Sequence, residues 1–148
     1  MILKEDAYNN RPTRAEVSIP RLINNFSIVR SLVEPEVKIM AVVKANAYGH
    51  GILRVTRELL TAGADYFGVA YLEEALYLRR HGITAPLVVL GAINTGQIRD
   101  FILNDIDITS SSLDKYRAIS RIATELGRTA NVHIKIDTGM ERIGVHWY

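Results

Sequence analysis

Short apolar runs alternate with amphipathic segments along most of this 148-residue chain. The apolar runs are rich in β-branched residues, so we predict that they form strands. They cover residues 15–19, 37–43, 66–70, 86–90, 107–109 and 132–136. Between these runs the apolar residues recur every three or four positions, which is the spacing of one helix face. The predicted helices begin near Pro20, Ile52, Leu72, Thr95 and Ser112.

The alternation of strands and helices indicates an α/β protein with a parallel sheet. Two architectures share this pattern: an open doubly wound sheet and a (β/α)8 barrel. Nucleotide-binding open sheets carry a G-x-G-x-x-G or G-x-x-x-x-G-K-[ST] motif, and the sequence contains neither. A complete barrel needs about 250 residues and eight strands, whereas the pattern supplies five core strands. The pattern alone leaves open whether the chain is part of a barrel or a small open sheet.

Composition and charge exclude several classes of protein. The chain has 18 Lys and Arg residues against 16 Asp and Glu, and the two signs are interspersed, which does not indicate binding to nucleic acid. The short basic cluster Arg79-Arg80-His81 is interpreted as a solvated helix end. The chain has no cysteine and no apolar run of the roughly 18 residues that a membrane helix needs. The N-terminus lacks the pattern of a secretory signal, so we expect a cytoplasmic protein that does not bind membranes.

A lysine follows the most apolar predicted strand and begins a glycine-containing loop. Lys44 comes directly after Ile39-Met-Ala-Val-Val43, and functional groups in α/β folds gather where strands end. Apolar surroundings disfavour an ammonium group and favour the neutral amine that imine chemistry requires. Tyr48 offers a hydroxyl, and Gly49 and Gly51 let backbone amides approach an anion. These residue types fit a site for pyridoxal phosphate, and they also fit a surface lysine followed by a turn.

The same segment resembles that of a known family. Residues 41–51, Ala-Val-Val-Lys-Ala-Asn-Ala-Tyr-Gly-His-Gly, resemble the cofactor-lysine segment of the alanine racemases, which are pyridoxal-phosphate enzymes with a TIM-like barrel. Residues 63–75, 87–91 and 133–145 are similar to the second, third and fifth strands of that family with their loops. The resemblance implies that residues 1–148 are the N-terminal portion of a pyridoxal-phosphate-binding (β/α)8 barrel. It also implies an isomerase that interconverts L-alanine and D-alanine for peptidoglycan, with pyridoxal 5'-phosphate as its cofactor.

The family motifs imply roles for five residues. Lys44 binds the cofactor covalently and serves as acid and base on one face of the substrate carbon. Tyr48 hydrogen-bonds the cofactor phosphate, and Leu90 lines the cofactor. Arg142 approaches the ring hydroxyl and the substrate carboxylate, a charge-assisted contact that suits a guanidinium. Lys135 stands where many members carry a carbamylated lysine that orients this arginine, but its alternation with apolar neighbours also fits a side chain that points the other way.

Other residues of these motifs are expected to have structural roles. Asp137 and Thr138 shape the loop before Arg142, and His50 is structural in the loop after Lys44. Glu141 stands where glycine is more common in the family. The histidines do not have the spacing of metal ligands, so we expect no metal site.

We expect a truncated form of the family enzyme, which continues with further barrel strands and a C-terminal β-domain and acts as a homodimer. Racemisation needs an acid or base on each face of the substrate carbon. The family's second group is a tyrosine from the partner's C-terminal domain, and no tyrosine here lies in a matching motif. The chain is therefore expected to need a C-terminal half, as a fragment, a piece of a split enzyme or a decayed gene product. Two other hypotheses remain: a non-catalytic pyridoxal-phosphate-binding module, and a structural remnant that binds nothing.

Overall fold

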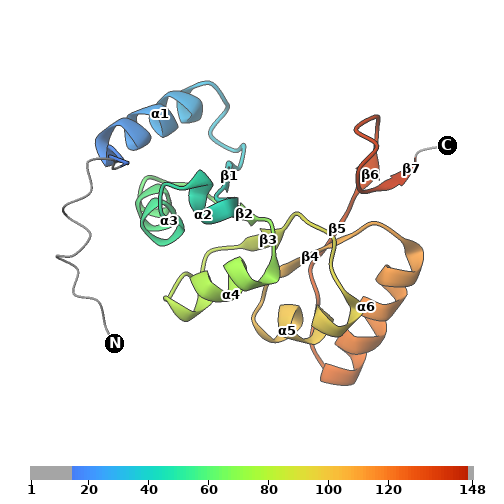
Figure 1. Cartoon of the computed structure of the whole chain (residues 1–148). Helices are drawn as coiled ribbons and strands as arrows, with labels where there is room; N and C mark the ends of the chain where they lie inside the picture. The colour runs from blue at the N-terminus through green and yellow to red at the C-terminus, as the bar shows by residue number, and fades with distance from the viewer. Residues whose placement is uncertain (1–14, 147–148) are drawn as a thin grey trace.

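Five parallel strands form one sheet in the order in which they occur along the chain (Figure 1). The computed structural model describes residues 15–146. The strands are β1 (Met40–Val42), β2 (Tyr66–Val69), β3 (Leu87–Val89), β4 (Asp107–Ser110) and β5 (Val132–Ile134). Each strand pairs in parallel with the next one in sequence. The predicted α/β class with about five parallel strands is therefore confirmed.

The strand order decides between the two architectures that the sequence pattern left open. A doubly wound sheet reverses direction part-way, which places helices on both of its faces. Here every crossover steps in the same direction, and the connecting helices lie on one side of the sheet (Figure 1). This is the arrangement of a sector of a (β/α)8 barrel. The connecting helices are α3 (Ile52–Thr61), α4 (Leu72–Arg80), α5 (Ile98–Leu103) and α6 (Leu113–Leu126).

Two further helices flank β1. The helix α1 (Ile19–Ser31) precedes it and contacts α3, and α2 (Lys44–Tyr48) is a single turn between β1 and α3. The strand predicted at residues 15–19 is wrong, because residues 15–18 are irregular and Ile19 already begins α1. Pro20 lies in the first turn of this helix, where its fixed φ suits the helix and no N–H is needed.

Strand β1 is shorter than the predicted run 37–43. Within the described residues it pairs on one side only, with β2, and that pairing begins where Met40 lies opposite Tyr66. Before this point the Asp65 carboxylate accepts a hydrogen bond from the Ile39 N–H at 2.7 Å. The N–H of Asp65 in turn donates to the Ile39 carbonyl. At Ile39 these two hydrogen bonds to Asp65 take the place of regular strand pairing with β2, and residues 37–39 are irregular.

The core lies between the sheet and its connecting helices. Every second strand residue points to this side, and Phe67, Val69, Leu87, Val89 and Ile108 are all at most 1% exposed. Fully buried helix residues pack with them in the same cluster: Leu78, Ile98, Phe101 and Ile119. The burial of these side chains, each worth about 1.5–3 kcal/mol, is the main stabilising contribution to the fold.

The opposite face of the sheet carries a polar network. The Tyr66 hydroxyl donates to the carboxylate of Asp107, which is only 6% exposed. The same carboxylate contacts the ring of His133 at 3.0 Å and accepts from the Asn131 amide at 3.1 Å. This network links β2, β4 and β5 across the face that would line a barrel.

The basic cluster at the end of α4 is not simply solvated, so that interpretation is wrong for Arg79. Its guanidinium is half-buried and donates to four backbone carbonyls, those of Ile83, Ala85, Asn104 and Asp105, at 2.7–3.0 Å. Burial lowers the pKa of Arg79 below its usual value, and the nearby Asp105 carboxylate partly offsets this. Arg79 therefore fastens α4 to the loops that precede β3 and β4.

The two outer strands of the described sheet, β1 and β5, each have one neighbour. On β1, Met40 and Val42 are 39% and 40% exposed on the face away from the helices. After β5 the chain forms a separate two-stranded sheet, β6 (Ile136–Asp137) with β7 (Val145–His146), which projects from the main sheet (Figure 1). Within residues 15–146, every helix is too short or too polar to span a bilayer.

Candidate functional site

Lys44 lies at the carboxyl end of β1, where the chain changes direction. The strand ends at Val42, and Lys44 is the first residue of α2 and is half-buried. The N–H of Val43 donates to the Gly68 carbonyl at 2.8 Å, which fixes the backbone directly before the lysine to β2. The fold therefore places an amine at the edge of the sheet where functional groups gather in barrels.

The backbone after Lys44 forms a left-handed turn. Four successive non-glycine residues, 45–48, have φ between +51° and +55°. This conformation costs L-residues roughly 1–2 kcal/mol each, so a run of four stores considerable strain. Gly49 and Gly51 continue with φ of +89° and +91°, which glycine adopts without that cost. The side chain of Asn46 accepts a hydrogen bond from the Ile52 N–H at 2.9 Å and so ties the turn to α3.

A pocket of about 310 Å³ joins three of the predicted site residues. Lys44, Leu90 and Arg142 all line it, although nearly one hundred residues separate the first from the last. They come from the ends of β1 and β3 and from the loop between β6 and β7. The remaining lining residues, which the sequence analysis did not identify, are Ala70, Tyr71, Gly91, Ala92 and Ile143.

The wall formed by the ends of β2 and β3 depends on Gly91. A Cβ atom at this position would lie 2.4 Å from the carbonyl oxygen of Ala70, so a larger residue would push the two strand ends apart. The sequence offers a signal for this residue, since a glycine directly after the apolar run of β3 marks a close approach of backbone. Tyr71 lies two residues after the end of β2, as Gly91 does after β3. Its side chain lines the pocket and is 64% exposed.

The loop that carries Arg142 is organised by Asp137. One carboxylate oxygen accepts from the N–H groups of Gly139 and Glu141, and the other from the N–H of Arg142, at 2.9–3.0 Å. These backbone hydrogen bonds lower the pKa of Asp137 from 3.8 to about 2. The loop-shaping role expected for Asp137 is confirmed, and Thr138 is exposed beside it.

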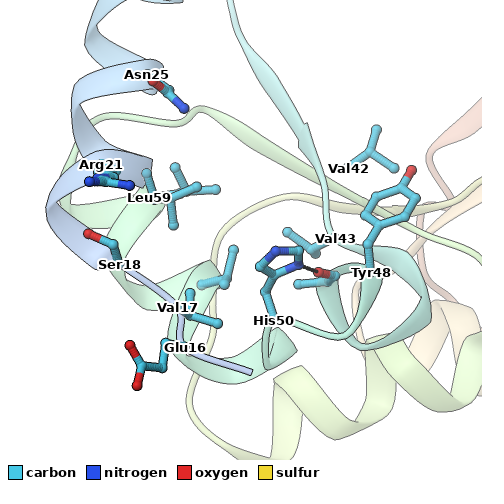
Figure 2. Close-up of a pocket in the computed structure, with 13 residues that line it drawn as sticks. Glu16, Val17, Ser18, Arg21, Asn25, Val42, Val43, Tyr48, His50 and Leu59 are labelled. Atoms are coloured by element: carbon cyan, nitrogen blue, oxygen red, sulfur yellow. Dashed lines mark hydrogen bonds between the residues drawn. The ribbon is translucent and has the colours of Figure 1, made fainter. Parts of the chain in front are cut away.

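Tyr48 lies outside this pocket. It is 61% exposed and lines a neighbouring cavity of about 560 Å³ between α1, α2 and β1. Figure 2 shows its ring beside Val42, with His50 at the other side of the turn. A ring nitrogen of His50 lies 2.8 Å from the Ala47 carbonyl, which agrees with a structural part for His50.

Lys135 is also not among the residues that line the pocket. It sits between β5 and β6 and is half-buried, whereas its apolar neighbours Ile134 and Ile136 are exposed. Its N–H donates to the Ser110 carbonyl, and its own carbonyl accepts from Val145. Lys135 thus joins the main sheet to β7 through its backbone, and its carbamylation stays a prediction. Among residues 15–146 no group of three His, Asp or Glu side chains could hold a metal ion.

Comparison with known proteins identifies the family. The family profile described as "Alanine racemase, N-terminal domain" matches residues 17–148. The chain belongs to the alanine racemase family. Alanine racemase 2 of Caldanaerobacter subterraneus subsp. tengcongensis is 45% identical over 134 residues, which are 90% of this chain and 34% of that protein. The alanine racemase of Methanococcus maripaludis is 43% identical over 91% of this chain and 36% of its own length.

Solved structures of racemases show the same fold. Alanine racemase of Clostridium difficile 630 in complex with cycloserine has a TM-score of 0.89 at 41% identity, over 93% of this chain and 38% of that one. Histidine racemase of Leuconostoc mesenteroides subsp. sake has a TM-score of 0.82 at 34% identity, over 93% and 37% of the two chains. The chain thus spans about a third of the length of these relatives. The five-stranded sheet corresponds to the N-terminal part of their barrel.

Proposed function

We propose that residues 1–148 are the N-terminal portion of the pyridoxal-phosphate-binding barrel of an alanine racemase, an isomerase that interconverts L-alanine and D-alanine. The observation that carries this proposal is the pocket that joins Lys44, Leu90 and Arg142 at the carboxyl ends of the strands. A surface lysine followed by an ordinary turn would not be expected to share a pocket with an arginine from a distant loop.

The groups in the pocket fit pyridoxal 5'-phosphate. Lys44 supplies a primary amine, Arg142 a guanidinium for an anionic oxygen, and Leu90 an apolar surface for a ring. The volume of about 310 Å³ lies at the lower end of the range for small-molecule sites. Tyr48, at the far end of the left-handed turn, is the proposed donor to the phosphate.

The chain's own residues divide the work in this proposal. When bound, pyridoxal 5'-phosphate supplies an aldehyde that condenses with an amine, releasing water, and a ring that withdraws electrons from the reacting carbon. The Nζ atom of Lys44 would hold the cofactor, and the same amine, once the substrate amine has displaced it, would move a proton on one face of that carbon. Arg142 orients the substrate carboxylate, and a carbamylated Lys135 would hold a negative charge to steer the arginine.

In this proposal the acid or base for the second face of the reaction lies outside residues 1–148. We propose that a C-terminal part, contributed within a homodimer in the cytoplasm, supplies the second acid or base. The exposed Met40 and Val42 and the single neighbours of β1 and β5 are consistent with such a completion. Alanine is proposed as the substrate from the names of the relatives, although one relative of the same fold is a histidine racemase.

A non-catalytic pyridoxal-phosphate-binding module is the second candidate. It rests on the pocket with Lys44, whose groups suit the cofactor with or without a second acid or base. Both candidates predict cofactor binding, but only the first predicts turnover once the rest of the barrel is supplied.

The test is to combine the purified chain with the C-terminal part of a related alanine racemase and with pyridoxal 5'-phosphate. We expect conversion of L-alanine to D-alanine, lost in Lys44→Ala and kept in Lys38→Ala, an exposed lysine on the same segment. Cofactor binding without conversion would favour the binding module. Failure of the chain to bind the cofactor at all would contradict both candidates.

A further inference from the structure

The carboxylate of Glu74, in the first turn of α4, reaches two segments of the candidate site. Its Oε1 atom accepts from the Ala45 N–H at 2.6 Å, and its Oε2 atom accepts from the Ala70 N–H at 2.8 Å. Ala45 directly follows Lys44, and Ala70 lines the pocket. Short hydrogen bonds to a carboxylate are among the stronger ones in proteins.

Glu74 holds the start of the strained turn that follows Lys44. Residues 45–48 form the strained left-handed turn, and such a conformation persists only where its surroundings impose it. The side chain of Asn46, the second residue of this turn, anchors it to Ile52, and Glu74 anchors its first residue, Ala45. The same side chain fixes the end of β2, so the carboxylate sets the separation of two walls of the pocket.

We propose that Glu74 is a positioning residue for Lys44, and that it directs the amine into the pocket by holding the backbone at Ala45 and at Ala70. This inference rests on the proposed function, because Lys44 needs a defined direction only if it binds the cofactor. A carboxylate suits this task since each of its oxygens accepts one N–H. Glutamine has the same length but presents an NH2 group to one of the two donors, so it cannot replace both contacts.

The neighbouring Glu73 provides a matched control. It is exposed and lies in the same first turn of α4, so both acids interact alike with the helix dipole. Replacing Glu73 by Gln removes the same charge without touching Ala45 or Ala70. Any difference between the two glutamine variants therefore reports the two backbone hydrogen bonds.

The test compares Glu74→Gln with Glu73→Gln in the full chain by two measurements. The first is the dissociation constant for pyridoxal 5'-phosphate, which we expect to rise about tenfold in Glu74→Gln alone. The second needs no cofactor: the rate at which an amine-acetylating reagent modifies Lys44, relative to Lys38, is read by peptide mass spectrometry. We expect this ratio to change at least about twofold in Glu74→Gln and to stay at the wild-type value in Glu73→Gln.

A folded Glu74→Gln variant with the wild-type ratio and the wild-type dissociation constant would overturn the proposal. If Glu74→Gln does not fold, Glu74→Asp is used, which keeps the charge but is too short to reach both donors, and the same criteria apply. The two proposals can fail separately. Unchanged cofactor attachment in Lys44→Ala would refute the proposed function, whereas the labelling ratio tests the positioning of Lys44 by itself.

Discussion

At the scale of single residues, the conformation of the loop that carries Arg142 depends on the carboxylate of Asp137. Asp137 accepts three backbone hydrogen bonds, which is why its pKa falls to about 2. Because the pKa is lower in the folded chain than in the unfolded one, the ionised group stabilises the loop at any pH above about 4. The contribution is lost progressively as the pH falls from about 4 to 2.

We therefore predict that the loop opens in acid before the core unfolds. Amide hydrogen exchange of Gly139 and Glu141 should accelerate, after correction for intrinsic rates, by about tenfold between pH 4 and pH 2. Asp137→Asn should already exchange faster at pH 5 and should lose this pH dependence. The control is Asp114→Asn, whose side chain is almost fully exposed. Identical exchange in Asp137→Asn and the unmodified chain would contradict the account.

Sequence motifs predicted several residues that line the pocket, but not the residues that hold its walls in place. Lys44, Leu90 and Arg142 could be predicted because each lies in a motif of the family, and they share one pocket. Glu141 is informative in another way: its φ of +57° explains why glycine is more common there. Glu74 was not predicted, since its importance depends on two hydrogen bonds to segments distant in sequence.

At the scale of elements, periodicity located the helices and strands, but pairing set their limits. The strand expected at residues 37–43 shortens because β2 is its only partner in the described sheet and begins opposite Met40. Residues 15–19 were expected as a strand, yet they have no partner strand among residues 15–146, and Ile19 joins α1. The limits of a strand therefore cannot be predicted from its own residues alone, because they depend on where the neighbouring strand lies.

The end of α4 gives a prediction at this scale. Arg79 satisfies four carbonyls with the fork of its guanidinium, and a lysine cannot reproduce that geometry. Arg79→Lys should lower the free energy of unfolding by about 1–3 kcal/mol, measured by urea denaturation. Arg80→Lys, one residue further and exposed, should change it by less than about 0.5 kcal/mol. Equal effects of the two substitutions would show that Arg79 is only a solvated helix end.

At the scale of the whole molecule, strand order carries the information that the sequence pattern lacked. Both an open sheet and a barrel produce the same alternation of strands and helices. Only the sequential order β1 to β5, with the helices on one side, identifies a barrel sector (Figure 1). Because every connection between strands has the same hand and leads to the next strand in order, the helices cover one face of the sheet and leave the other uncovered. The uncovered face carries the network of Tyr66, Asp107 and His133.

The central claim is that Lys44 is the residue that binds the cofactor. The most direct measurement is to mix the chain with pyridoxal 5'-phosphate, reduce with borohydride, digest, and identify the modified lysine by mass spectrometry. The account predicts modification predominantly at Lys44, with little at the exposed Lys38 under the same conditions. Modification spread evenly over the lysines, or absent from Lys44, would contradict it.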